Sequence, residues 1–498
     1  MDNFFRTIVN SFTTNLISEG RYQMVLEGLQ ITLLITLCSA VLGTLLGGLV
    51  CWARMSHKPW IQRCAKVYIE LMRGTPVLVL LMLMYYVFLA PLETTGIFVS
   101  IVTFAMNMSA YVGEMLRTGI QSIDKGQREA GLALGYTPRQ VFGRIILPQV
   151  VRKIMPVYIG EVISLLKGTS IVGYIAVVDM TRASDLIRSR TFDAFFPLIV
   201  TAAVYFLVAW LIGLLLNGLV EKKKKHVIWA SILLVFMGSL GSISSIMNKA
   251  KDTTDTIPPL FRQLEGKSVG VVIGSIQDIA VTRYAPDADI LRFSTMTDMV
   301  ASLETGKTDI IIVESITVLA NEELAASVDT IDAGLPPIPI GACMKLGNTA
   351  LQEDFNRFIA EIRADGTYLK LHDRWLSNAD VFSIPMPKRH GTGRKITVGT
   401  FPTFPPFNFI RMGEPSGYEI DFLTEWANRR NYQLEFIILD FSSQIPAVQT
   451  GKADMAMGLI AVTEERQKKV LFSDGYYESR MMFYTRKGEG ARIFKTDN

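Results

Sequence analysis

Cysteine and histidine are scarce in this chain, with four residues of each type among 498. Cys38 and Cys51 fall in or beside the first long apolar run and Cys64 lies just after it. Cys343 is therefore alone in the second half, and no disulfide is available there. The histidines have neither the spacing of metal ligands nor a neighbouring nucleophile, which argues against an enzyme; they are His57, His226, His372 and His390.

Net charge and nucleotide-binding motifs are equally sparse. The 50 basic and 46 acidic residues leave a formal charge of only +4. The basic residues gather at the ends of apolar runs instead of on one soluble face, which argues against nucleic-acid binding. The sequence contains no Gly-rich lysine loop of the Walker type. We therefore expect this chain to bind no cofactor and to have no catalytic or metal-binding residues.

Hydrophobic residues are in excess, at 49% of the chain and with a mean hydropathy of +0.30. The excess lies in the first half, where apolar runs of about 20 residues match the thickness of a bilayer. Ordinary soluble α/β sequence follows residue 250. We predict a multidomain protein with an all-α polytopic membrane domain, whose spans lie at 24–52, 74–92, 96–116, 154–178, 195–219 and 227–247.

Basic residues indicate how these spans are oriented. They follow the first span, are frequent in 117–153, and form the run KKKK at 222–225. Because positive loops stay in the cytoplasm, these three segments should be cytoplasmic and the soluble part should lie outside. The basic loop TRASDLIRSR on the outer side is a mild exception. The N-terminus lacks a cleavable secretory signal, so we expect the first span to direct membrane insertion.

The long segment 117–153 between the third and fourth spans is expected to have a function, because compact bundles usually have short connections. Its residues favour two short helices that project from the membrane: REAGLAL contains good helix formers, Gly135 is a natural stop, and Pro138 can start the next helix. An ordinary amphipathic loop helix is the alternative explanation.

The sequences EAGLALG and IILP resemble the EAA loop of ABC importer permeases, which docks on a separate ATPase. MRGTP, GIQSIDKGQREAG and LLKGTSIVGYI further resemble the polar amino acid subfamily, so the likeness covers about residues 20 to 220. The resemblance implies a permease domain at 1–222, an additional transmembrane helix at 223–250, an ATPase partner that uses the ATP, and a homodimer. It also implies a coupling turn at Glu129, Ala130 and Gly135, with Gly131 where the family commonly has Ala.

Two ionisable residues, Glu161 and Lys167, lie within the fourth predicted span. Each costs about 2.5 to 3.5 kcal/mol at the membrane centre. Six residues apart on a helix, they point to different faces and should not pair. They are candidates for lining the transport pathway; the alternative is that Glu161 is a cap near the cytoplasmic entrance and Lys167 bonds to carbonyls of a neighbouring helix.

The soluble part alternates strands and helices, which predicts two α/β lobes with parallel sheets. We place a tether at 251–265, one lobe at 266–336, a return strand with closing helices at 337–376, a linker at 377–394, and the other lobe at 395–498. The helices are expected to begin at Ser275, Thr295 and Tyr418.

The motifs GTFPTFPPFNFI, GYEIDFLTEWANR and QTGKADMAMGLIAVTEERQKKVLFSDGYYES resemble the first lobe of periplasmic amino acid-binding proteins of type II. GKSVGVVIGS, LETGKTDIIIVES and GTYLKLHDRWL resemble that family's second lobe and closing segment, so the usual order is reversed. This favours a circular permutation whose new ends fall at the hinge and whose old ends are joined by the linker. A degenerate tandem of half-domains and lobes paired between two chains stay open as alternatives.

The resemblance implies a ligand site in the cleft. Arg466 would bind the ligand carboxylate and Glu314 its ammonium group. Phe404 and Phe407 would form an aromatic wall, and the free amides of Gly274 and Ser275 would meet the carboxylate. The alternatives are that the phenylalanines belong to the core and that Ser275 is a helix cap.

Three residues depart from the family pattern: Phe401 replaces a ligand-binding Asp, and Leu459 and Ala461 replace Gly and Ser or Thr. Losing those polar partners weakens the case for a standard α-amino acid, because a buried charge left unpaired on the ligand is costly.

Together the motifs predict the permease subunit of an ATP-driven importer in the bacterial inner membrane, with a tethered extracytoplasmic domain that delivers a small polar amino acid. A ligand-gated channel or solute sensor is the alternative. Channels of that kind insert their pore between the lobes, whereas here both lobes follow all the spans.

Overall fold

The computed structural model describes residue 9 and residues 11–90, 94–191, 193, 195–220, 257–315, 322–377 and 380–494. It separates into two compact units, a helical one built mainly from 16–184 and 198–251 and an α/β one built mainly from 252–498. The predicted sixth span at 227–247, the helix 223–250 that contains it and the KKKK run lie outside the described residues.

The helical unit contains long apolar helices where the sequence predicts spans. Four described helices are long and apolar enough to cross a membrane. They are α2 (Tyr22–Arg54), α5 (Gly96–Gln121), a continuous run from Pro138 to Ile175 and α10 (Phe196–Val220). The run consists of α7 (Pro138–Val141), η5 (Phe142–Ile146), α8 (Leu147–Gly168) and η6 (Thr169–Ile175). The shorter elements are η1 (Thr13–Ile17), η2 (Ser18–Gly20) and α9 (Met180–Thr191).

The second predicted span, 74–92, is a bent pair of helices instead of one straight helix. α3 (Pro59–Gly74) meets α4 (Val77–Leu83) and η3 (Met84–Phe88) at an angle of 106°. Thr75 is extended because it precedes Pro76, and a residue before proline avoids the helical region. The side-chain amide of Asn107 on α5 donates to the carbonyl of Met72 at 2.8 Å, which ties the end of α3 to its neighbour.

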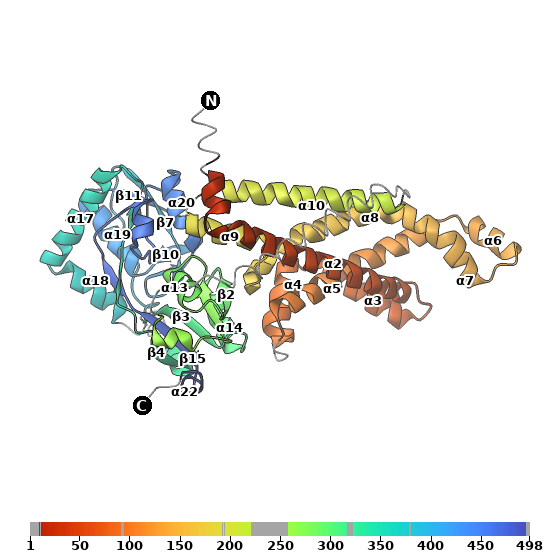
Figure 1. Ribbon diagram of the computed structural model, residues 1–498, viewed down its shortest axis with the longest axis horizontal. Coiled ribbons are helices and arrows are strands. Elements are labelled where there is room, and N and C mark those ends of the chain that lie inside the picture. Colours follow the sequence, from red (N-terminus) through yellow and green to blue (C-terminus); the bar gives the residue numbers. More distant parts are fainter. Residues whose placement is uncertain are drawn as a thin grey trace, which may run out of the picture. The chain divides into compact units, whose positions relative to one another are not determined.

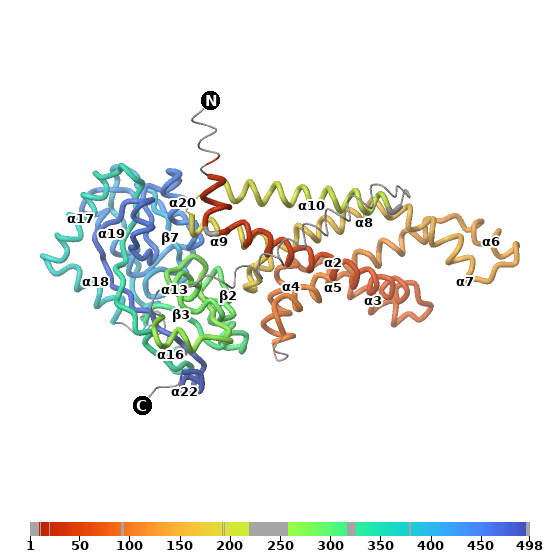
Figure 2. The backbone as a smooth tube through the Cα atoms, viewed as in Figure 1, coloured from red at the N-terminus to blue at the C-terminus, as the bar shows by residue number. Residues whose placement is uncertain are grey.

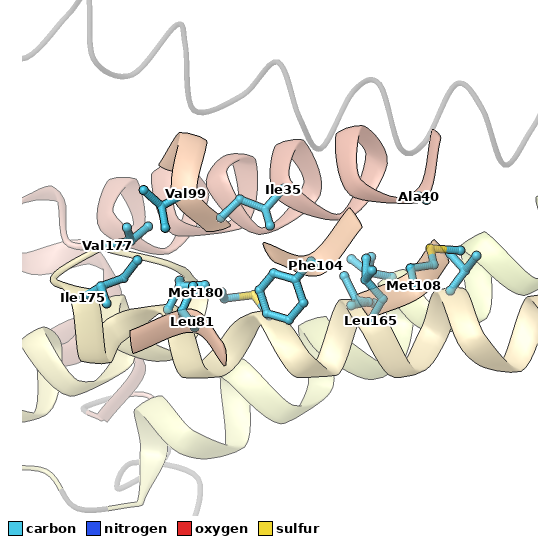
Figure 3. Close-up of a cluster of buried hydrophobic side chains, with 14 of the residues drawn as sticks. Ile35, Ala40, Leu81, Val99, Phe104, Met108, Leu165, Ile175, Val177 and Met180 are labelled. Atoms are coloured by element: carbon cyan, nitrogen blue, oxygen red, sulfur yellow. The ribbon is translucent and has the colours of Figure 1, made fainter. Parts of the chain in front are cut away.

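One apolar cluster holds the helical unit together. Ile35 of α2, Phe104 and Met108 of α5 and Leu165 of α8 are buried in it, as Figure 3 shows. α2 and α5 lie so close that a Cβ atom at Gly47 would stand 2.7 Å from the side chain of Val112. Glycine at this point therefore allows the two helices to pack directly.

The α/β unit has two five-stranded sheets. The sheet of the first lobe has the order β11-β7-β12-β6-β13, in which β6 is antiparallel to both neighbours. The sheet of the second lobe has the order β2-β1-β3-β15-β4, with β15 antiparallel to both neighbours. The first sheet consists of β6 (Cys343–Met344), β7 (Lys395–Thr400), β11 (Gln433–Ile438), β12 (Met455–Ala456) and β13 (Leu471–Phe472). The second consists of β1 (Ser268–Val272), β2 (Asp289–Phe293), β3 (Ile310–Glu314), β4 (Val328–Asp332) and β15 (Met481–Arg486).

Two antiparallel strands connect the lobes, β5 (Ile338–Ile340) and β14 (Tyr477–Ser479). β5 leads from β4 of the second lobe to β6 of the first, and β14 leads from the first lobe back to β15. Figure 1 shows dark-blue β15 among the green strands β3 and β4. The prediction that 395–498 form the first lobe alone is therefore wrong beyond β14, because the described residues from β15 to Phe494 belong to the second lobe.

Helices cover both sheets, and three of them begin where the sequence predicts. Ser275 caps α13 and Thr295 caps α14, each by accepting a hydrogen bond from a backbone N–H three residues on, and α19 begins at Tyr418. The helices of this unit are α12 (Pro259–Arg262), α13 (Ile276–Tyr284), α14 (Met296–Glu304), α16 (Glu322–Ser327), α17 (Thr349–Ala364), α18 (Thr367–Leu376), α19 (Tyr418–Arg430), η8 (Phe441–Ser443), α20 (Gln444–Gln449), α21 (Glu464–Gln467) and α22 (Gly490–Ile493). A small sheet adds β8 (Thr403–Phe404), β9 (Asn408–Arg411) and β10 (Glu414–Ser416).

The described part of the linker, 380–394, lies along the first lobe (Figure 2). Asn428 at the end of α19 bonds to the backbone of this segment twice, accepting from His390 N at 2.8 Å and donating to Lys388 O at 2.9 Å. Gly393 N donates to Asn431 O at 2.9 Å. This segment, which we call the strap, is fixed along its length instead of forming a loose loop.

Candidate functional sites

The predicted coupling turn is a short exposed helix followed by a tight reversal. α6 (Lys125–Ala133) begins at Asp124, whose carboxylate accepts from the N–H of Gly126. It ends where Gly135 adopts a φ of +83°, a left-handed conformation that glycine takes without strain. The stop predicted at Gly135 is confirmed.

The helix that follows the reversal is not the separate short helix that the sequence predicts. Thr137 and Gln140 form a capping box around Pro138, which is the first helical residue, as expected. From there the helix continues through η5 into α8 without a break. The projecting segment is thus α6 folded back on the extended beginning of the fourth span.

Gly131 is the point where α6 contacts that extension. It is buried, and a Cβ atom there would stand 2.8 Å from Cδ1 of Ile145 and 2.9 Å from Cγ2 of Val141. Glu129 and Ala130 are exposed beside it, as are Leu132 and Leu134. Glycine in place of alanine therefore permits a closer helix contact, and it leaves a carboxylate and two leucines facing outward.

The pathway candidates Glu161 and Lys167 both lie on α8. Glu161 is half-buried and Lys167 is exposed. The described residues contain no ion pair between them, in keeping with the helical spacing.

In the α/β unit, residues of both lobes surround one cavity. The second lobe contributes Ser275 and Gln277 from the start of α13 and Glu314 from the end of β3. The first lobe contributes Phe404, Phe441 and Leu459. The rest of the lining is aliphatic, from Val272, Ile276, Ile312 and Val313. Ser275, Glu314 and Phe404, all predicted for the ligand site, are thus brought together.

Arg466 is 2% exposed and bridges the lobes. Its Nη1 donates to Ala461 O of the first lobe and its Nη2 to Gly274 O of the second, both at 2.9 Å. Its guanidinium carbon also lies 5.9 Å from the ring centre of Phe441. Burial lowers the pKa of Arg466 to about 10, so the group stays charged at neutral pH. Among the described residues no carboxylate pairs with it, which suits it to an anionic ligand group.

Glu314 is the acidic counterpart in the second lobe. Its Oε1 accepts from Nε2 of Gln277 at 2.7 Å, and both side chains are buried. Burial raises the pKa of Glu314, and the hydrogen bond from Gln277 only partly opposes the shift. The described part of the chain places no cation beside this carboxyl group.

The predicted roles of Gly274 and Phe407 are not supported by this geometry. The Gly274 N–H donates to Oδ2 of Asp278 at 2.9 Å, and the Ser275 N–H donates to Val272 O at 3.1 Å. These amides are therefore not free for a carboxylate, and the Gly274 carbonyl faces Arg466 instead. Phe407 is fully buried against Tyr418 and Tyr477, outside the cavity lining, so it belongs to the core.

Three residues near the cavity were not predicted as site residues. Phe441 and Gln277 line it. Glu419, fully buried, accepts from Leu459 N and Asn408 Nδ2, each at 2.8 Å, and from the Tyr476 hydroxyl. Burial raises the pKa of Glu419 as well. Glu419 belongs to the motif GYEIDF, but the sequence carries no signal that its carboxylate reaches the loop at Leu459.

Comparisons with known proteins agree with both halves of the chain. Residues 39–226 match the family of binding-protein-dependent transport system inner membrane components, and residues 396–498 match the bacterial extracellular solute-binding proteins, family 3. An arginine transport system permease protein of Bacillus subtilis is 34% identical over 40% of this chain and 92% of its own length. An L-cystine transport system permease protein of the same species is 30% identical over 44% of this chain and 95% of its own.

A solved structure of an amino acid ABC transporter is 35% identical, covering 41% of this chain and 97% of that one with a TM-score of 0.38. The relatives are transporter permeases, so the alternative of a ligand-gated channel or sensor is not favoured. The chain belongs to the binding-protein-dependent transport permeases of ABC transporters, and it carries a family 3 solute-binding domain in the same polypeptide.

Proposed function

We propose that this chain is the permease subunit of an ABC importer for amino acids, located in the bacterial inner membrane with its solute-binding domain outside. The relatives named for arginine and cystine transport support the substrate class. A receptor in the same chain raises its own effective concentration at the pore to about the millimolar range, whatever the supply of free binding protein.

The observation that carries the proposal is the exposure of Glu129 on α6. Gly131 holds this helix against Val141 and Ile145, so Glu129 projects with Leu132 and Leu134 on a compact surface. A surface with one carboxylate among apolar side chains suits docking into a groove of a separate ATPase subunit. We infer that Glu129, Ala130, Gly131 and Gly135 transmit ATP-driven movement to the spans, and that ATP is bound by the partner.

The transport pathway is proposed to form between two copies of this chain. One permease chain supplies half of a transporter, so a homodimer with two receptors is expected. Glu161 and Lys167 are the proposed polar residues of the pathway. The domain with its lobes closed on the ligand would dock on the outer face of the spans.

We further propose that the solute-binding domain is circularly permuted and that its lobes pair within one chain. The exchange of β6 and β15 between the lobes supports this over a tandem of half-domains, because neither sheet is complete without a strand that follows the other lobe. The strap would then join the old ends, from α18 to β7.

Glu129 gives the direct test. Glu129→Lys reverses the charge at the proposed docking surface without altering the Gly131 contact. Reconstituted with its ATPase in proteoliposomes, this variant should lose at least about nine tenths of amino acid uptake while ATP hydrolysis continues uncoupled, since coupling residues contribute through positioning. Lys125→Gln, also exposed on α6, is the matched control and should transport normally. Normal uptake by Glu129→Lys would contradict the coupling role.

A further inference from the structure

Leu459 occupies a backbone conformation that leucine rarely adopts. Its φ is +56°, in the left-handed region that favours glycine. Its N–H is held by Oε1 of the buried Glu419 at 2.8 Å, so the backbone cannot easily relax to another conformation. Its side chain is 5% exposed and lines the cavity between the lobes. A strained residue fixed at this place fills space that glycine would leave open.

Phe401 packs against two of the aromatic rings that line the cavity. Its ring centre lies 5.6 Å from that of Phe404 and 5.8 Å from that of Phe441, and both of those rings line the cavity. Phe401 itself is 3% exposed. With these side chains in place the cavity measures about 10 Å³, room for about one water molecule. The closed cleft is thus too small for any amino acid.

The charged groups at the cleft also have partners within the protein, apart from Nε of Arg466, which is buried and has no hydrogen-bond partner among the described residues. Arg466 joins the lobes by donating to one backbone carbonyl on each side. Glu314 has Gln277 as its donor. The two buried groups of opposite charge that a zwitterion would satisfy are therefore already bonded to neutral partners of the protein.

We propose that the side chain of Leu459 fills the part of the cleft where a ligand would bind, and that Leu459 is the main residue that limits which amino acids the cleft accepts. Phe401 helps to position it. The lobes close over Leu459 without a ligand, and a free amino acid has to compete with this self-closed state. The apparent affinity for amino acids is therefore reduced by the fraction of molecules that are open. This inference concerns the same cleft as the proposed function and rests on it for the ligand class.

The test uses the full chain in lipid nanodiscs and two variants. Leu459→Gly removes the occupant and suits the left-handed backbone. Met412→Gly is the matched control, because Met412 also has a positive φ, +51°, but is 89% exposed on a hairpin away from the cavity lining. Spin labels on K452C in the first lobe and E304C in the second, both exposed positions, report the distance between the lobes; Cys38 and Cys64 are replaced by serine in every variant. Amino acid binding is titrated with each of the twenty standard amino acids separately.

We expect the wild type and Met412→Gly to give one short label distance without ligand, unchanged by any amino acid at the concentrations that saturate Leu459→Gly. Leu459→Gly should give a second, longer distance and bind at least one amino acid about tenfold more tightly than the wild type or more. A wild type that is open without ligand and closes on an amino acid would overturn the inference while leaving the proposed function intact. Failure of Leu459→Gly to bind any amino acid would overturn both the role of Leu459 and the substrate class, whereas the coupling test on Glu129 stands separately.

Discussion

The two lobes of the solute-binding domain have sheets with equivalent strand arrangements. Each sheet includes one strand that follows the other lobe in the sequence, but the two lobes depend on that strand to different degrees. In the first lobe that strand is β6, with two residues that pair with β12 and β13. In the second lobe it is β15, with six residues and five paired positions on each of β3 and β4. The second lobe therefore relies more than the first on a strand that is distant in the sequence.

Deletion of β15 should have the largest effect on the difference in stability between the two lobes. A chain that stops after Ser479 loses β15, an inner strand of the second sheet between β3 and β4, and with it the fully buried Phe483 and Tyr484. We expect the second lobe to unfold, because removing an inner strand leaves two rows of unpaired backbone groups and a large void. Limited proteolysis of the full membrane-inserted protein should then cut within 257–315, which is protected in the complete chain.

The control for this truncation is a chain that stops after Phe494, which keeps β15 and α22. It should resist protease as the complete chain does. If the shorter chain were equally resistant, the second lobe would be stable without β15, and the exchange of strands could not support the permutation.

The strap gives a smaller effect in the first lobe. A Cβ atom at Gly391 would stand 1.7 Å from the backbone carbonyl oxygen of Tyr432, which follows α19. Gly391→Ala must therefore displace the strap from α19, and we expect it to lower the free energy of unfolding of the domain by about 1 to 3 kcal/mol. Denaturant unfolding of the full chain, followed by fluorescence of the buried Trp375 and Trp426, measures the loss.

Lys388→Ala changes an exposed side chain of the same strap and leaves its backbone bonds in place. It should alter the unfolding free energy by less than about 0.5 kcal/mol. Equal stability of the two variants would mean that the strap is only loosely attached, contrary to a link that joins the old ends of a folded domain.

Much of this architecture was predictable where the signal is local. Ser275, Thr295 and Pro138 mark helix starts because capping depends on residues within one turn. The return strand predicted within 337–376 includes β6 of the first-lobe sheet. β15 was not assigned to the correct lobe, because the lobe of a strand depends on pairing with residues distant in the sequence. The 106° bend before Pro76 was likewise missed, since an apolar run reveals length but not direction.

The ligand site shows the same limit. The charges of Arg466 and Glu314 predicted that both residues lie at the ligand cleft. Their hydrogen-bond partners could not be predicted, because these partners depend on how the backbone folds. Asp278 takes the Gly274 amide that was expected to meet a ligand, and no spacing in the sequence discloses that bond. Leu459 stood out as a departure from a glycine, but its backbone strain is visible only in the structure, where its φ is +56°.

The two lobes also differ in how they hold a buried acid, and the smallest predicted effect tests that difference. Glu419 in the first lobe accepts hydrogen bonds from three donors, whereas Glu314 in the second lobe accepts one from the side chain of Gln277. Burial raises the pKa of Glu314 above its ordinary value of 4.5. The folded state then keeps a proton that the unfolded state has lost, so the contribution of Glu314 to stability is fully present below about pH 4.5 and is lost as pH rises through the folded pKa.

Glu314→Gln removes this titration and keeps a partner for Gln277. Between pH 4.5 and neutrality its unfolding free energy should fall less steeply than that of the wild type, by at most about 1.4 kcal/mol per pH unit. Thermal unfolding of the full chain across this range measures the difference, and the exposed Glu353→Gln should follow the wild type. Parallel curves for Glu314→Gln and the wild type would place a cation beside Glu314 in the folded protein, and with it an unrecognised partner for the second lobe's acid.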